Sequence, residues 1–331
     1  MADTEAAALH GDAVIFDGLT IAKWSRRVFE DMAKGGLTAA NCTCSVWEGF
    51  LGTMDNVAAW KRWLAENDDI LTQVHGVADI HRAKREGRVG IVLGWQNTFA
   101  IEGELDRLRV FRDLGVRFMQ LTYNTQNLVG AGCWESKDNG LTDFGRDVVS
   151  EMNALGIAVD LSHVGEQTCR DAIEHSIVPV AFTHCVPRGL KDMPRNKSDD
   201  LLKLAADKGG FVGFAPYGPF LPTGDDSTLD DCIKGIEYTI DLVGEDAVGI
   251  GTDFTQGHDA AFFSWLRHDK GNGRALVEGM SPVPKNPVGL DGMKDYPNLT
   301  RAMLARGWPA ERVRKVMGGN WLNHLEAVWG R

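Results

Sequence analysis

Eight short runs of apolar and β-branched residues recur along the chain, separated by longer amphipathic segments. The runs cover residues 13–21, 37–46, 89–96, 117–123, 157–164, 178–184, 210–216 and 247–254. Because each run is almost continuously apolar, it is typical of a parallel strand that is buried on both faces. Alternation of strand and helix eight times over predicts the α/β fold class, with residues 1–331 forming one TIM-type (β/α)8 barrel.

Helical spacing of apolar residues indicates helices between these strands. Residues 103–114 and 143–155 show it most clearly. Gly115 and Gly156 follow these two segments, where C-terminal glycines belong. Further helices are expected near residues 228–243, 297–306 and 309–328.

One segment, residues 255–295, does not fit this alternation. It carries glycine and proline throughout and shows no clear periodicity. Because it follows the eighth predicted strand, we expect it to lie as a long loop over the active-site face. Loops of this length are usually functional or disordered, so a lid or a subunit contact is expected, with a simple insertion as the alternative.

Composition narrows the class of partner. The 331 residues carry a formal net charge of −11, and such an acidic surface does not attract nucleic acid or an anionic membrane. No apolar run approaches the roughly 20 residues that span a bilayer. The acidic N-terminus lacks a signal peptide, so a cytoplasmic location is expected. The six scattered cysteines are expected to be reduced thiols, and the expected partner is a small-molecule substrate.

Three of the apolar runs end in a side chain that can bind metal or move a proton. His163 ends the fifth run, His184 the sixth and Asp253 the eighth. In a parallel barrel the carboxyl ends of the strands face the active site, so these side chains are expected to converge. Imidazoles are typical ligands of a hydrolytic metal site, and the carboxylate can accept a proton from water or substrate. A single histidine is more often a core residue, but two at consecutive strand ends favour a site.

Several motifs resemble those of one family. They are DLSHV at 160–164, FTH at 182–184 followed by Pro194-Arg195-Asn196, GIGTDF at 249–254, YPNLTRAMLARGW at 296–308 and the final GGNWLNHLEAVW. Together they resemble the membrane (renal) dipeptidase family of metallopeptidases in the amidohydrolase superfamily, from Val14 to Trp329. The resemblance implies a distorted (β/α)8 barrel with two zinc ions that cleaves dipeptides and tolerates D-residues at the C-terminal side and β-lactam-like amides. A homodimer is also expected, because dimers occur in the family.

The resemblance assigns roles by position. His163 and His184 match the two histidines that bind the second zinc. Arg195 matches the arginine that grips the substrate carboxylate, a role that suits a planar bidentate donor. Asp253 matches the aspartate that handles the proton at the end of the last strand.

The sequence also departs from the family at the first metal. Leu19 and Ile21 replace the His-x-Asp of the first strand, and neither can hold a divalent ion. Gln96 stands at the position of the glutamate that bridges the two metals, and Tyr123 at that of a histidine that polarises the substrate. His163, His184 and Gln96 therefore remain as a ligand set for at most one zinc.

We therefore expect a dipeptidase-like hydrolase that acts on an amide or other C–N bond of a small substrate bearing a carboxylate. Asp253 and Tyr123 are the expected catalytic residues, and Arg195, Tyr123 and Asn124 the expected substrate contacts. At most one Zn²⁺, held weakly, is the expected cofactor. Two alternatives stay open: a metal-free enzyme acting on a small amino-acid derivative, and a catalytically inactive homologue that binds a ligand or a partner enzyme.

Overall fold

The computed structural model describes residues 2–330, and its strands form one parallel sheet. Strands β1, β2, β4, β5, β6, β7, β8 and β9 are hydrogen-bonded in that order, and β3 pairs only with β4. Their bounds are β1 Phe16–Thr20, β2 Ala39–Ser45, β3 Leu71–Gln73, β4 Val89–Trp95, β5 Val116–Gln120, β6 Ala158–Asp160, β7 Ala181–Cys185, β8 Phe211–Phe214 and β9 Val248–Ile250. Each of the eight predicted runs overlaps a strand, and the predicted TIM-type α/β barrel is confirmed.

The two edges of the sheet meet just beyond β9. Thr20 forms a parallel bridge with Phe254, and the Ile21 amide donates to the Phe254 carbonyl at 2.9 Å. The Asp253 amide donates to the Leu19 carbonyl at 3.0 Å. These contacts close the barrel at the carboxyl ends of its strands, so the residue after β1 and the residues after β9 become neighbours.

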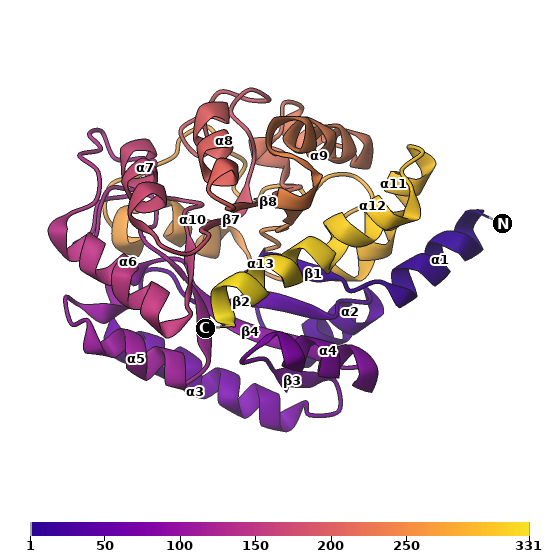
Figure 1. The fold of residues 1–331 in the computed structure, drawn as a ribbon, viewed down its shortest axis with the longest axis horizontal. Helices are drawn as coiled ribbons and strands as arrows, with labels where there is room; N and C mark the ends of the chain where they lie inside the picture. Colours follow the sequence, from indigo (N-terminus) through magenta and orange to yellow (C-terminus); the bar gives the residue numbers. More distant parts are fainter. Residues whose placement is uncertain (1, 331) are drawn as a thin grey trace.

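Helices surround the barrel on the outside, as Figure 1 shows. Their bounds are α1 Ala2–Asp12, α2 Arg26–Lys34, α3 Phe50–Glu66, α4 Val77–Glu86, α5 Asp106–Asp113, α6 Asp143–Leu155, α7 Glu166–His175, α8 Asp199–Asp207, α9 Leu229–Val243, α10 Ala260–Arg267, α11 Tyr296–Ala305, α12 Ala310–Arg314 and α13 Asn320–Trp329. Helix α6 has the predicted bounds, and α9 begins after Thr228, whose side chain caps it. No helix within residues 2–330 has both the length and the apolar character to cross a membrane.

The C-terminal segment differs from its prediction as one helix over 309–328. It divides into α12, a π-helical turn at Lys315–Gly319, and α13. Gly318 lies against the backbone of Val14, where a side chain would collide. Helix α13 then carries Trp321 into the barrel, and its indole Nε1 donates to the Ile250 carbonyl at 2.9 Å. The break therefore lets the last helix pack against the base of the strands.

The 255–295 segment contains a helix that its sequence did not predict. Asp259 caps α10 by accepting from the amides of Ala261 and Phe262, each at 3.1 Å. Phe263 and Leu266 are buried on its inner face. Two turns of helix are too short for a clear apolar period, which explains why this segment was expected to be a loop.

Candidate active site

A small cavity of about 70 Å³ lies at the carboxyl ends of the strands. Its lining residues are Ile21, Gln96, Tyr123, Asn124, Trp134, His163, Arg195, Tyr217, Phe220, Asp253, Thr255, Phe263, Leu266, Arg267, Val277 and Met280. All the candidate residues named from the sequence line it except His184, which contacts His163 from behind. The six lining residues from Thr255 to Met280 all belong to the 255–295 segment, so part of that segment walls the cavity.

The two histidines face each other through Nε2, at a distance of 3.0 Å. His163 Nδ1 lies 2.8 Å from Asn124 Oδ1, and His184 Nδ1 lies 2.8 Å from Thr183 Oγ1. The Thr183 hydroxyl donates a hydrogen bond to Asp160 at 2.6 Å, so it accepts the hydrogen bond from His184 Nδ1. With the Asn124 carbonyl oxygen toward His163, both histidines carry their proton on Nδ1. Two Nε2 lone pairs then converge on one point, where only a shared proton or a cation relieves their repulsion.

Burial, with nearby positive charge, keeps these imidazoles neutral. Burial lowers the pKa of His163 and of His184 well below the ordinary value, and Arg195 and Lys197 lower both further. A neutral imidazole is the form that binds a metal or accepts a proton.

Asp253 combines an unusual backbone with a perturbed carboxyl group. Its φ of 55° lies in the left-handed region, as does the φ of 61° at Asn124, and both residues line the cavity. Asparagine and aspartate tolerate this conformation better than other side chains, and strain of this kind often marks functional sites. Burial raises the pKa of Asp253 to about 7, while Arg195 lowers it and Asp17 raises it. Such a carboxyl group can take up and release a proton near neutral pH.

Two buried aspartates, Asp160 and Asp17, help to position His184 and Asp253. Each aspartate binds the threonine that directly precedes one of these two residues. Asp160 accepts from the Thr183 amide at 3.0 Å and from its hydroxyl, and Thr183 orients His184. Asp17 accepts hydrogen bonds from the Thr252 amide at 2.8 Å and from the Thr252 hydroxyl at 2.6 Å. Thr252 directly precedes Asp253. Sequence reasoning gave neither aspartate a role. The available signal was that a threonine directly precedes both His184 and Asp253 at the ends of apolar runs.

Arg195 brings a buried positive charge to the floor of the cavity. Its side chain is almost fully buried, with 1% exposed. Nη1 donates to the Ser162 carbonyl at 2.8 Å and Nη2 to the His184 carbonyl at 2.9 Å, while Nε is buried without a partner. The ion pairs formed within residues 2–330 include none to Arg195. A buried cation without a counter-charge is costly, so the cavity favours an anion.

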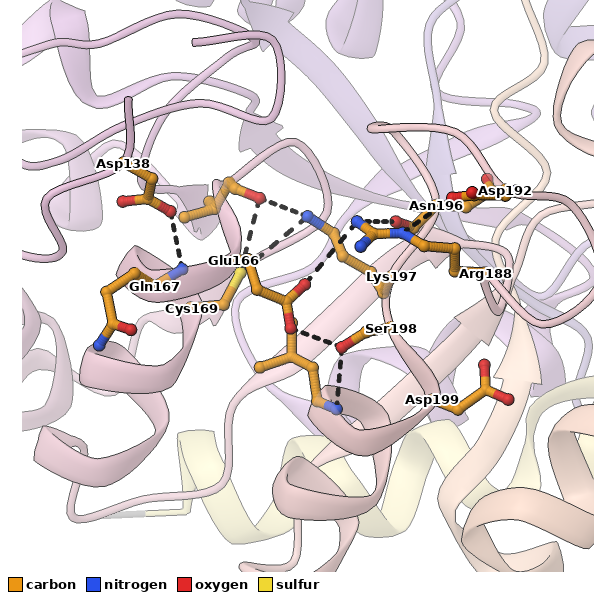
Figure 2. A network of polar contacts seen from close by, with 12 residues as sticks. Asp138, Glu166, Gln167, Cys169, Arg188, Asp192, Asn196, Lys197, Ser198 and Asp199 are labelled. Atoms are coloured by element: carbon orange, nitrogen blue, oxygen red, sulfur yellow. Dashed lines mark hydrogen bonds and ion pairs between the residues drawn. The ribbon is translucent and has the colours of Figure 1, made fainter. Parts of the chain in front are cut away.

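Figure 2 shows a polar network around Arg188, Asn196 and Lys197, which lie close to Arg195 in the sequence. Lys197 donates from Nζ to the Val164 carbonyl, and its backbone amide donates to the Val186 carbonyl at 3.0 Å. Arg188 donates to the Asn196 carbonyl at 3.0 Å and lies 3.8 Å from Glu166. The loop that carries Arg195 is thus tied to the start of α7, which fixes the position of the Arg195 backbone.

Tyr123 and Cys44 occupy different surroundings. Tyr123 stacks on the His163 ring with centroids 4.2 Å apart, and burial and Asp253 raise the pKa of its hydroxyl. It therefore stays protonated and can donate a hydrogen bond.

Burial raises the pKa of the Cys44 thiol to about 12, and Cys44 lines a neighbouring cavity instead of this one. A thiol of this kind is a poor nucleophile at neutral pH.

Comparison with known families supports the resemblance noted in the motifs. The family described as Membrane dipeptidase (Peptidase family M19) matches residues 21–265. The chain belongs to the membrane dipeptidase family.

Individual proteins of known structure or curated name are also similar to this chain. An amidohydrolase from Pseudomonas aeruginosa is 52% identical, with a TM-score of 0.96 over 98% of this chain and 99% of that one. Dipeptidase tcpJ from Claviceps purpurea (strain 20.1) is 29% identical over 280 residues, which is 83% of this chain and 60% of that protein. The present chain therefore spans about 60% of the length of the curated protein that it matches. A metallo peptidase from Rhodobacter sphaeroides, liganded with a phosphinate mimic of L-Ala-D-Ala, shares the fold at 21% identity, with a TM-score of 0.79 over 96% of this chain and 100% of that one.

The residues of this chain do not fit a pair of metal ions. Leu19 and Ile21 are buried and apolar where the family resemblance implies ligands. Gln96 is neutral, donates from Nε2 to Thr43 at 3.1 Å and leaves its Oε1 buried without a partner. Within residues 2–330, no group of three histidine, cysteine, aspartate or glutamate side chains is placed to hold a metal ion.

A single cation fits better at the histidine pair. Two nitrogens bound to one tetrahedral zinc at about 2.0–2.1 Å lie about 3.3 Å apart, close to the observed separation of the two Nε2 atoms. The hydrogen bond at each Nδ1 is typical of zinc-bound histidine. The separation of the two Nε2 atoms is thus compatible with two ligands of one metal ion.

Proposed function

We propose that this protein hydrolyses an amide bond in a small substrate that bears a free carboxylate. The observation that carries the proposal is the buried Arg195 guanidinium, which forms no ion pair with a carboxylate of residues 2–330 and lines the same cavity as Asp253. The acid end of a substrate would supply the missing counter-charge through two parallel hydrogen bonds. Membership of the membrane dipeptidase family supports the same class of reaction.

The reaction adds water across the amide bond and releases an acid and an amine. Arg195 would hold the substrate carboxylate, and Tyr123 and Asn124 would donate hydrogen bonds to the rest of the substrate. Asp253 would accept a proton from the attacking water and return it to the leaving nitrogen, a role that suits its pKa of about 7. Helix α10 would keep bulk water out, because Phe263 and Leu266 close the cavity.

One Zn²⁺ held by His163 and His184, with the Gln96 amide oxygen as a further ligand, would polarise the scissile carbonyl. The neutral imidazoles and the orphan Gln96 Oε1 support this arrangement. The apolar Leu19 and Ile21 support the alternative of an enzyme that works without metal on a small amino-acid derivative. Metal content per chain, measured together with activity, separates the two.

Hydrolysis by wild type and Asp253→Asn tests the proposal. A panel of dipeptides and N-acyl amino acids, with L- and D-residues at the C-terminal side, would be incubated with purified protein, and free amine would be quantified by mass spectrometry. We expect at least one free-acid substrate to turn over and the variant to lose 100-fold or more in rate, because asparagine cannot accept the proton. Asp207→Asn, an exposed position on α8, is the matched control and should not change the rate. An active Asp253→Asn enzyme would remove Asp253 from the mechanism.

A further inference from the structure

A second, larger cavity of about 200 Å³ lies beside the candidate active site. Its lining residues are Ile21, Ala22, Trp24, Thr43, Cys44, Ser45, Val46, Glu48, Asn56, Trp60, Trp63, His258, Phe262 and Trp265. Ile21 lines both cavities, and α10 divides them: Phe262 and Trp265 face this cavity, whereas Phe263 and Leu266 face the other. The two cavities are therefore neighbours across a thin apolar wall, at the position where the family resemblance implies a metal ligand.

Aromatic rings dominate the second cavity. The buried Trp60 forms part of its wall, with the Trp24 ring 4.7 Å and the Trp63 ring 5.3 Å away between centroids. From α10, Phe262 and Trp265 add two more rings, 5.8 Å apart. Aromatic faces carry a negative electrostatic potential, so a cluster of them attracts an organic cation.

The charged side chain of this cavity is also negative, as is the electrostatic potential of the aromatic faces. Glu48 is the one acidic or basic side chain among the lining residues besides His258. Burial lowers the pKa of His258 to about 4, so His258 is neutral at pH 7; Lys23 and Asp259 act on it with opposite charges. Glu48 accepts hydrogen bonds from the Val46 amide at 2.8 Å and from Asn56 Nδ2 at 3.4 Å, which holds its carboxylate in place.

We propose that this cavity binds an organic ammonium group. The rings would contact its alkyl or methyl groups, and Glu48 would balance its charge. An uncharged apolar group would also fill the space, but it would remove water from Glu48 without neutralising it, which is unfavourable. The proposal goes beyond the proposed function, because this ligand would occupy a cavity of its own, separated by α10 from the cavity that Arg195 lines.

Direct binding of choline tests the proposal without any turnover. Calorimetry with the purified full chain would compare choline with 3,3-dimethylbutan-1-ol, which has the same shape but no charge. We expect choline to bind at least tenfold more tightly than its neutral analogue. Glu48→Gln should weaken choline binding by about tenfold. Trp63→Leu and Trp265→Leu, which lie on different elements, should each weaken it by about 2- to 30-fold, the range for a cation over a ring.

Two matched variants control for indirect effects. Trp134→Leu alters a half-buried ring of the other cavity, and Glu174→Gln removes an exposed carboxylate on α7. Neither should change choline affinity, and thermal melting would confirm that every variant is folded. The proposal would be overturned by any of three results. Choline and its neutral analogue could bind equally, neither could bind, or Glu48→Gln and both tryptophan variants could keep full affinity for choline. Because no result depends on catalysis, the ammonium site can fail while the hydrolase proposal stands, and the reverse.

Discussion

At the scale of single residues, Asp253 is a carboxylate whose place in the fold costs stability. It is 9% exposed and lies near Asp17 and Asp160, and these surroundings raise its pKa from 3.8 to about 7. The folded protein therefore binds a proton that the unfolded chain releases between these values. Stability arising from this group is greatest below about pH 4 and falls as pH rises toward 7.

Asp253→Asn should remove this cost. In metal-free protein at pH 8, we expect the free energy of unfolding in urea to rise by about 1–4 kcal/mol relative to wild type, since each pKa unit corresponds to about 1.4 kcal/mol. At pH 3 the difference should nearly vanish, because Asp253 is then largely protonated in both the folded and the unfolded state. A variant that is less stable than wild type at pH 8 would show that the carboxylate is structural.

The apolar pair Leu19 and Ile21 leads to a prediction about metal content. We expect plasma mass spectrometry after dialysis against zinc to find no more than one transition metal per chain, because neither side chain is a ligand. Leu19→His combined with Ile21→Asp restores the family pattern at the end of β1 and should raise zinc content above that of wild type. Two tightly held metals in the wild-type protein would contradict this account.

These residues also show how far sequence reasoning reached. The ends of apolar runs pointed to His163 and Asp253, and the family resemblance pointed to Arg195. All three residues line one cavity. Their assigned roles stay predictions. Asp17 and Asp160 could not be given a role, because their hydrogen bonds depend on how strands far apart in sequence pair.

At the scale of secondary-structure elements, glycines let β7 approach its neighbours. A Cβ atom on Gly18, Gly213 or Gly251 would overlap the carbonyl oxygen of Thr183 on β7. This close approach brings β1, β8 and the end of β9 against one point of β7. It also places Thr183 where Asp160 can bind it.

Gly251→Ala should therefore destabilise the barrel. We expect the free energy of unfolding to fall by about 3 kcal/mol, at the upper end for overpacking a core, because the clash is with backbone instead of a flexible side chain. Gly11→Ala on α1, where a Cβ atom meets nothing within 4 Å, is the control and should leave stability unchanged or slightly raised. Equal stability of the two variants would show that the strands can separate freely.

The elements were predictable to different degrees. Long apolar runs marked the eight main strands, and the period of α6 gave its bounds. Strand β3 has three residues and pairs on one side only, which is too little for a pattern. Helix α10 depends on Asp259 and on burial against the cavity, so its local sequence alone does not specify it.

At the scale of the whole molecule, the chain is acidic while the floor of its cavity is basic. The net charge is −11, yet Arg195 and Lys197 are both buried near the histidine pair. Arg267, on α10, also lines the cavity, but it is only partly buried and donates to the Ser281 carbonyl at 2.7 Å. A locally positive site inside an acidic protein selects a small anion by contact instead of by long-range attraction.

The most direct test of the central claim is the kcat/KM of one hydrolysed substrate against that of its C-terminal carboxamide. The account predicts that wild type prefers the free acid by about 10- to 100-fold, the value of a hydrogen-bonded charge. This preference should fall to a few-fold in Arg195→Lys, which loses the planar fork, and persist in the control Arg267→Lys. Equal rates on acid and carboxamide in the wild type, or an unchanged preference in Arg195→Lys, would contradict it.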